Sequence, residues 1–164
     1  MPDLHRIVVN TGPLIALAAG LGELTILREM YSEVVVAAEV AAEISTLRSG
    51  LFVQPPFARA TWIRRQPSAT PNSPWLSALL DPGEAAVIQL ALDEKIPLVC
   101  INEAAGRRAA KLSGLQLTGS IGILLRAKRE HRIPSLQVCL QAMRTNGVWL
   151  SDSLVNLTIA EAGE

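Results

Sequence analysis

Short runs of consecutive apolar residues, each followed by a helical pattern, recur along this chain. Residues 6–10 are largely β-branched and end on Asn10, and residues 97–101 form a second run followed by Asn102. A third run covers residues 33–36. Continuous apolar runs of this length are typical of strands buried on both faces, as in a parallel sheet. The pattern therefore predicts three central strands.

The segments between these runs have helical periodicity with clear start signals. Asp81 is a good N-cap, and Pro82 then suits the first helical position, where its missing N–H has no partner to lose. The helices are predicted over residues 13–20, 21–30, 37–46 (ending near Ser49 and Gly50), 82–94, 103–112, 118–131, 134–144 and from 152 to the last residue. A short further strand is expected at residues 115–117.

Residues 51–74 break this regularity, because five prolines interrupt them. Within this Pro-rich segment, residues 60–64 are expected to form a short edge strand and residues 66–74 an exposed loop. Strands alternating with helices predict an α/β fold, a three-layer α/β/α sandwich with a central, mostly parallel sheet. We expect one domain over residues 1–164.

Composition narrows the class of protein. Apolar residues make up 49% of the chain and aromatic residues only 4%, so the core must be aliphatic. Basic and acidic residues balance at 15 each, which argues against a large sequence-independent affinity for nucleic acid but leaves room for a local basic patch. Cys100 and Cys139 lie in apolar patterns and are expected to be buried, reduced thiols.

The chain start lacks a basic region followed by an apolar stretch, so no signal peptide is expected. No apolar run reaches the roughly 18 residues of a membrane span. We therefore expect a cytoplasmic protein.

Polar residues that could carry chemistry stand at the predicted carboxyl ends of strands, where open α/β sheets bind ligands. Two more carboxylates lie on nearby helices. The set is Asn10, Thr11, Asn102 and Glu103 at the strand ends, with Glu43 and Glu84 on the helices. Carboxylate and amide oxygens suit Mg²⁺ or Mn²⁺, and such an ion can activate water and offset phosphodiester charge.

Each of these residues also has a purely structural explanation. Asn10 and Asn102 could cap the helices that follow them, because Asn is a good N-cap. Glu43 could be a solvated residue of an amphipathic helix. Glu84 could be only the third residue of a capping arrangement with Asp81.

Several segments together resemble the PIN-like superfamily. They are VVNTGPLIAL at residues 8–17, DPGEA at 81–85, INEAAGR at 101–107, LTGSIGILLRAK at 117–128 and the IPS helix start at 133–135. The nearer resemblance is to the DUF3368 branch, relatives of the toxin ribonucleases of type II toxin–antitoxin pairs, over about residues 6–162. The resemblance implies an α/β/α sandwich and an acidic pocket that holds a divalent metal for hydrolysis of single-stranded RNA.

Under this resemblance the four acidic positions of the family fall on Asn10, Glu43, Glu84 and Asn102, with Glu103 directly after the last. Thr11 matches the small hydroxyl residue that follows the first acid. The two Asn residues depart from the pattern, because an amide oxygen can ligate a hard cation but brings no charge. Three carboxylates survive if Glu103 faces the pocket, and two if it does not.

Basic residues cluster after the second Asn. Arg107 follows a Gly, as an Arg of the branch often does, and is a candidate phosphate contact. Together with Thr11 and Arg108, it forms the predicted nucleic-acid-binding set. A second basic cluster, residues 126–132, lies at a helix C-terminus, where cations are ordinarily stabilising.

Two functions follow from these residues. The first is a metal-dependent endoribonuclease, using Mg²⁺ or Mn²⁺, as the toxin-like member of a toxin–antitoxin pair. The alternative is a catalytically degenerate PIN-like module that binds RNA or a small antitoxin protein, or a structural homodimer. A mean hydropathy of +0.30 is high for a small domain, so we also expect apolar surface that meets a partner, as in a dimer.

Overall fold

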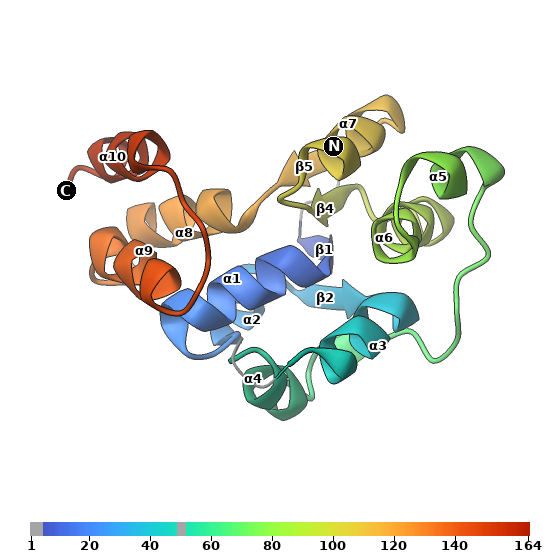
Figure 1. Ribbon diagram of the computed structural model, residues 1–164, viewed down its shortest axis with the longest axis horizontal. Helices are drawn as coiled ribbons and strands as arrows, with labels where there is room; N and C mark the ends of the chain where they lie inside the picture. Colours follow the sequence, from blue (N-terminus) through green and yellow to red (C-terminus); the bar gives the residue numbers. More distant parts are fainter. Residues whose placement is uncertain (1–4, 49–51) are drawn as a thin grey trace.

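A five-stranded parallel sheet forms the centre of the protein in the computed structural model, which describes residues 5–48 and 52–164 (Figure 1). Every neighbouring pair of strands is parallel, in the order β3-β2-β1-β4-β5. The strands are β1 (Arg6–Val9), β2 (Glu33–Val36), β3 (Arg64–Arg65), β4 (Leu98–Cys100) and β5 (Gln116–Thr118). Helices flank the sheet, so the predicted three-layer α/β/α sandwich is confirmed.

Each step from one strand to the next passes through at least one helix, because parallel neighbours need a crossover connection. The helices in the first half are α1 (Thr11–Leu21), α2 (Thr25–Met30), α3 (Ala38–Thr46), α4 (Gln54–Arg59), α5 (Pro74–Leu79) and α6 (Pro82–Asp93). The others are α7 (Ala104–Leu112), α8 (Ser120–Arg129), α9 (Leu136–Thr145) and α10 (Asp152–Glu161). None of the described helices is long and apolar enough to cross a membrane.

The strand order reverses direction at β1. The chain moves outward from β1 through β2 to β3, then returns to the other side of β1 and continues outward through β4 to β5. Such a reversal opens a crevice at the carboxyl ends of the two strands that flank it. β1 and β4 stay paired up to this edge, where the Asn10 N–H donates to the Cys100 carbonyl at 3.1 Å.

The core is aliphatic, as the composition predicts. Ile7, Val8 and Val9 of β1 are fully buried, because helices cover the sheet on both faces. Both cysteines are buried and free, which confirms the expectation of reduced thiols. Burial raises the pKa of the Cys100 thiol and keeps it protonated.

The Pro-rich segment is more ordered than its sequence suggests. It contains α4, and α5 begins at its last residue, Pro74. Neither helix was predicted, and each has proline in its first turn, where the missing N–H costs nothing. The edge strand lies at Arg64–Arg65 rather than at residues 60–64, because residues 60–63 form a turn closed by Ile63 N–H to the Ala60 carbonyl. The predicted helix end at residues 49–50 lies outside the described residues.

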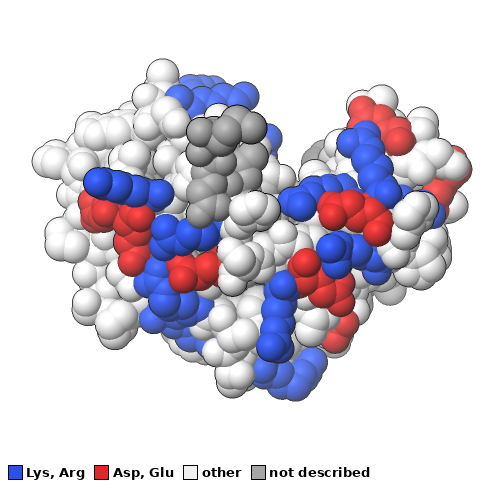
Figure 2. Space-filling view, turned by 180° about the vertical axis from the view of Figure 1, so that it is seen from behind, with Lys and Arg blue, Asp and Glu red and all other residues white. Residues whose placement is uncertain are grey.

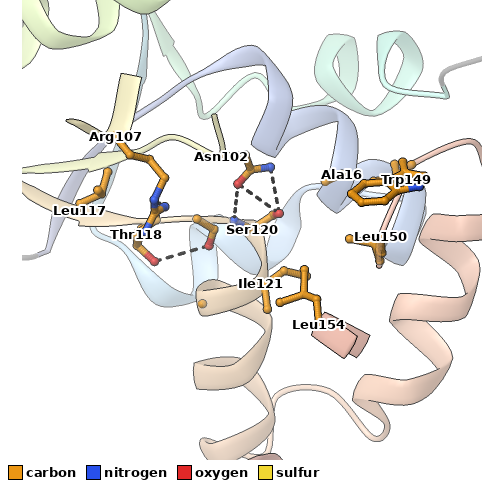
Figure 3. A pocket seen from close by; sticks show the side chains of 13 residues that line it. Ala16, Asn102, Arg107, Leu117, Thr118, Ser120, Ile121, Trp149, Leu150 and Leu154 are labelled. Atoms are coloured by element: carbon orange, nitrogen blue, oxygen red, sulfur yellow. Dashed lines mark hydrogen bonds between the residues drawn. The ribbon is translucent and has the colours of Figure 1, made fainter. Parts of the chain in front are cut away.

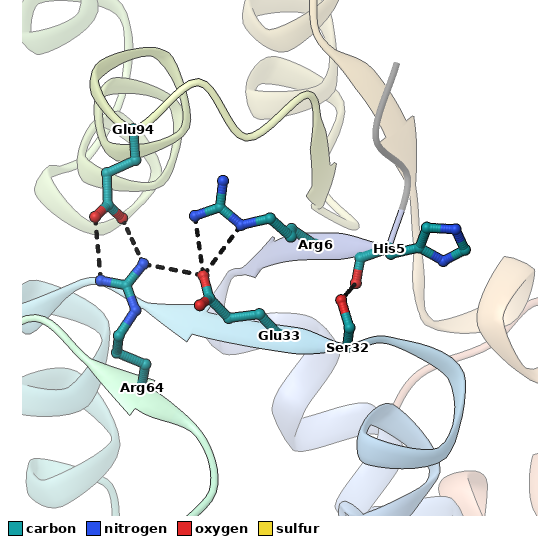
Figure 4. A network of polar contacts seen from close by, with 6 residues as sticks. All are labelled: His5, Arg6, Ser32, Glu33, Arg64 and Glu94. Carbon is teal, nitrogen blue, oxygen red and sulfur yellow. Dashed lines mark hydrogen bonds and ion pairs between the residues drawn. The ribbon is translucent and has the colours of Figure 1, made fainter. Parts of the chain in front are cut away.

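Charged side chains connect the amino-terminal edge of the sheet (Figure 4). Glu33 at the start of β2 accepts hydrogen bonds from Arg6 of β1 and Arg64 of β3, and Arg64 also binds Glu94 after α6. Burial alone would raise the pKa of Glu33, but the hydrogen bonds from Arg64 and Arg6 outweigh it and lower that pKa. The network therefore holds three strands in register at the edge opposite the crevice.

Glu33→Gln is expected to lower the free energy of unfolding at pH 7 by roughly 1 kcal/mol or less, because the network is partly exposed and screened by salt. The pKa of Glu33 is lowered in the folded state, so its contribution is present above the unfolded pKa and is lost as the pH falls through the folded one. Urea titrations at pH 7 and in acid, in low and high salt, measure this. A Glu29→Gln control, at an exposed position, should be neutral; an equal loss in both variants would contradict the role of the network.

Candidate functional site

A small acidic pocket of about 110 Å³ lies at the carboxyl end of β1. Four carboxylates from three segments of the chain line it, and we call it the acid pocket. Its lining residues are Asn10, Thr11, Gly12, Ile15, Glu43, Asp81, Glu84 and Glu103. The residues come from the start of α1, from α3, from the start of α6 and from the position just before α7. The strand reversal at β1 therefore coincides with a concentration of negative charge.

The first two polar residues after β1 face this pocket. Asn10 stands at the N-cap position of α1, but its side chain makes no capping hydrogen bond. The alternative explanation of Asn10 as a helix cap alone therefore has no support in its hydrogen bonds. Thr11 is buried, and its hydroxyl donates to Glu43 Oε2 at 2.9 Å. This bond fixes the Glu43 carboxylate on α3 relative to the start of α1.

Glu84 is the most deeply buried carboxylate of the pocket, with only 6% of its surface exposed. Asp81 caps α6 as predicted, because its Oδ1 accepts the Glu84 backbone N–H at 2.8 Å. The Glu84 side chain itself is not used in this cap. Its Oε1 is buried and has no hydrogen-bond partner within residues 5–48 and 52–164. A buried oxygen left in this state is costly, and such atoms are found at ligand sites.

The neighbours of Glu84 change its proton affinity. Burial raises the pKa of the Glu84 carboxyl to about 7, and the negative charges of Asp81 and Glu103 add to this effect. Glu103, which directly precedes α7, also lines the pocket. Three of the predicted carboxylates, Glu43, Glu84 and Glu103, therefore share this pocket with Asp81.

Gly83 has no side chain to fill the space between three side-chain oxygens of the site. A Cβ on Gly83 would lie 3.1 Å from Glu43 Oε2, 3.5 Å from Asp81 Oδ1 and 3.9 Å from Asn10 Oδ1. Side-chain oxygens from the N-cap of α1, from α3 and from the N-cap of α6 thus surround one point. Any larger residue at position 83 would fill that point.

The donor chemistry of the pocket fits a hard divalent cation, because every polar lining side chain offers oxygen. The buried, unpartnered Glu84 Oε1 and the space beside Gly83 support the same fit. In the described part of the chain, however, no three His, Cys, Asp or Glu side chains are already arranged to hold a metal ion. An ion in this pocket would therefore need the carboxylates to draw closer together.

Asp81 is the pocket residue that sequence reasoning missed. It was recognised only as a helix cap, because capping explains an Asp before a helix without any further role. The sequence DPGE contained a signal for this second role. Asp81 and Glu84 are three residues apart at a helix start, so their side chains lie on the same side of its first turn. One Asp81 oxygen can cap α6 while its carboxylate still lines the pocket.

Asn102 lies next to the acid pocket but does not line it. Its Oδ1 accepts the Ser120 backbone N–H at 2.9 Å, and its Nδ2 donates to Ser120 Oγ at 3.1 Å (Figure 3). Asn102 therefore supports the start of α8, rather than the start of α7 as its position in the sequence indicates. It borders a larger hollow of about 540 Å³, which we call the Trp149 hollow after the indole at its edge.

The two predicted basic residues are separated. Arg107 lines the Trp149 hollow, and its Nη1 donates to the carbonyls of Ile101 at 2.7 Å and Thr118 at 3.3 Å. Arg108 lies instead at a third, mostly apolar hollow between α5 and α7, with Leu79 and Leu112. The structure thus brings Asn10, Thr11, Glu43, Glu84 and Glu103 together, and sets Asn102 and Arg107 beside them and Arg108 elsewhere.

Glu84→Gln should change the pH dependence of stability. Because the pKa of Glu84 is raised from 4.5 to about 7, the folded state binds the proton more tightly than the unfolded state. The free energy of unfolding should therefore fall as the pH rises through this range, by on the order of 3 kcal/mol at most. Denaturant titrations from acid to pH 8 measure it.

In Glu84→Gln the free energy of unfolding should decrease much less as the pH rises, and the variant should be more stable than the wild type at pH 8. Glu161→Gln, at an exposed position of α10, is the matched control and should keep the wild-type profile. Parallel profiles for wild type and Glu84→Gln would show that Glu84 is not the buried acid described above.

Comparison with known proteins agrees with this architecture. Residues 6–164 match the model of the DUF3368 family, which is described as a PIN domain. No curated protein matches the chain. The match covers nearly all of the sequence, including every strand and helix that contributes to the acid pocket. The chain therefore belongs to the DUF3368 family of PIN domains.

Proposed function

We propose that this protein is a divalent-metal-dependent ribonuclease and that the acid pocket is its active site. The observation that carries the proposal is the convergence of Glu43, Asp81, Glu84 and Glu103 at the strand reversal, around a buried oxygen without a partner. The sequence comparison left either two or three carboxylates for this site. With Asp81 and the exposed Glu103, four carboxylates line the pocket, and this number supports an ion-binding site despite the neutral Asn10 and Asn102.

Electrostatics supports a cation in the pocket. Four carboxylates line the pocket, and no Lys, Arg or His is among its lining residues. Crowded carboxylates lower their mutual repulsion by taking up a proton or by binding a cation. Without a cation the Glu84 carboxyl takes the proton, as its pKa of about 7 indicates. A divalent ion would replace that proton at neutral pH.

The ion and the residues of the pocket would have different roles in hydrolysis. A bound Mg²⁺ or Mn²⁺ would supply the charge that activates water and stabilises the phosphodiester during hydrolysis. Thr11 fixes Glu43 through its hydroxyl, and Asn10 adds a neutral oxygen beside it. Glu84, whose pKa is raised to about 7, can take up the proton released from the attacking water at neutral pH.

The proposal extends to a toxin-like role with a small antitoxin protein as partner, on the strength of the family membership. It also includes a homodimer. Exposed Leu79 and Leu112, beside the hollow that Arg108 lines, are apolar side chains of the kind that a subunit interface covers. The competing function is an RNA- or protein-binding module without cleavage, which is favoured by the use of Asn102 to support α8.

Cleavage of single-stranded RNA with Mn²⁺ tests the catalytic proposal. Wild-type protein should cleave, and Glu84→Gln should be at least about 100-fold slower, because the site loses its proton acceptor and a charge. Glu29→Gln, exposed on α2 and outside the pocket, should cleave like wild type. Equal rates for wild type and Glu84→Gln would contradict the assigned role. Retained RNA binding without any cleavage would favour the binding module.

Metal affinity provides a separate test of the pocket. Asn10→Asp adds a carboxylate beside Glu43 and Asp81 and should strengthen Mn²⁺ binding by about tenfold, as charge count tunes such sites. Asn102→Asp should leave the affinity nearly unchanged, because that side chain is directed to Ser120. Isothermal titration calorimetry with Mn²⁺ compares the two variants. The reverse order of effects would show that the ion sits by Asn102.

A further inference from the structure

The Trp149 hollow, at about 540 Å³, is larger than the acid pocket of about 110 Å³, and the two share no lining residue. We propose that it binds one base of a single-stranded RNA, stacked on Trp149, with Arg107 contacting the phosphate next to that base. The inference rests on the proposed function of the acid pocket and assigns the substrate a binding site outside it.

The two sides of the hollow differ in chemistry (Figure 3). Asn102, Arg107 and Thr118 form a polar side at the carboxyl ends of β4 and β5. Trp149, Leu150 and Leu154 form an apolar side, from the α9–α10 connection and the start of α10. A nucleotide has the matching two-sided character, since its base offers an apolar face and its phosphate a negative charge.

Trp149 is unusually exposed for its size, at 84% of its surface. Its neighbours in the chain are nevertheless fixed: Val148 N–H donates to the Met143 carbonyl at 2.9 Å, and Arg144 Nη2 donates to the Leu150 carbonyl at 2.7 Å. The indole is therefore held at the edge of the hollow by an anchored backbone while its ring remains open to solvent. Proteins that bind single strands use aromatic rings in this way, because every base has a face that can stack.

Arg107 supplies the charge on the opposite side. It forms no ion pair with any described residue, and its hydrogen bonds go to backbone carbonyls through Nη1 alone. These two bonds fix the position of the guanidinium group. No carboxylate of a described residue pairs with its positive charge. The surface is otherwise mixed, and Figure 2 shows Lys and Arg interleaved with Asp and Glu over one face. A locally unpaired Arg is thus the kind of contact that a phosphate needs.

The hollow adjoins the acid pocket. Gly12 lines the acid pocket, and a Cβ at that position would lie 4.0 Å from Nδ2 of Asn102, which lines the hollow. The two cavities thus share a border at Asn102, which is the geometry that the proposed strand needs in order to run from the hollow to the carboxylates. A duplex cannot bind in this way, because its bases are already stacked on one another.

Both ends of the Asn102 amide are engaged by Ser120, which limits its use for reading a base edge. The site should accordingly accept any base, since stacking is tolerant of sequence. An apolar peptide is a poorer match, because it offers no charge for Arg107.

Binding of a short single-stranded oligoribonucleotide, measured in EDTA, tests the inference independently of cleavage. The strand should quench indole fluorescence, and Trp149→Ala should bind it about tenfold more weakly. Trp149→Phe, which keeps an aromatic face, should recover most of the affinity. Trp75→Phe, at a partly exposed indole on α5 away from the hollow, is the matched control and should bind like wild type. Since Trp149 is exposed, these variants should fold normally.

An abasic strand of the same length separates stacking from phosphate contact, and it should bind more weakly and leave the indole fluorescence unquenched. Equal affinity of wild type and Trp149→Ala, equal quenching by the abasic strand, or quenching by an apolar peptide but not by RNA would each overturn the inference. Stacking without cleavage in Mn²⁺ would support the base site and refute only the ribonuclease proposal. Cleavage without stacking would refute the base site and leave the ribonuclease proposal standing.

Discussion

The crowding of four carboxylates at one edge of the sheet is the constraint on which the rest of this structure depends. Glu43, Asp81, Glu84 and Glu103 line a pocket that has no basic side chain among its lining residues. Like charges held this close raise the free energy of the folded state unless a proton or a cation offsets them. Burial is the main cause that raises the pKa of Glu84 to about 7, and repulsion from the negative charges of Asp81 and Glu103 adds to it.

The fold sustains this crowding through its topology. The reversal of strand order at β1 opens the edge, and three helix starts and α3 each deliver a side chain to it. Opposite this edge, the Glu33 network joins the first residues of three strands. The aliphatic core between the two edges buries Ile7, Val8 and Val9 of β1, so the polar residue that follows them has a fixed position.

Regular elements were predictable where periodicity and caps agreed. The central strands and α6, with Asp81 at its N-cap, follow the sequence closely because local and global preferences coincide there. The Pro-rich segment was harder, since proline signals both a loop and the first turn of a helix, and only packing distinguishes them. Asp81 was missed as a pocket residue for a similar reason, because one local role already explained it.

The sequence by itself determined the parallel α/β architecture, the aliphatic core and the polar residues at the strand ends, because each depends on local spacing and composition. It could not decide which way a side chain turns after a strand ends. Asn10 and Asn102 follow paired strands in the same manner, yet one faces the carboxylates and the other binds the first residue of α8. That choice depends on α8, which begins 18 residues after Asn102 in the chain. Only the tertiary structure brings such distant partners together, and it thereby assigned one Asn to each of two adjoining cavities.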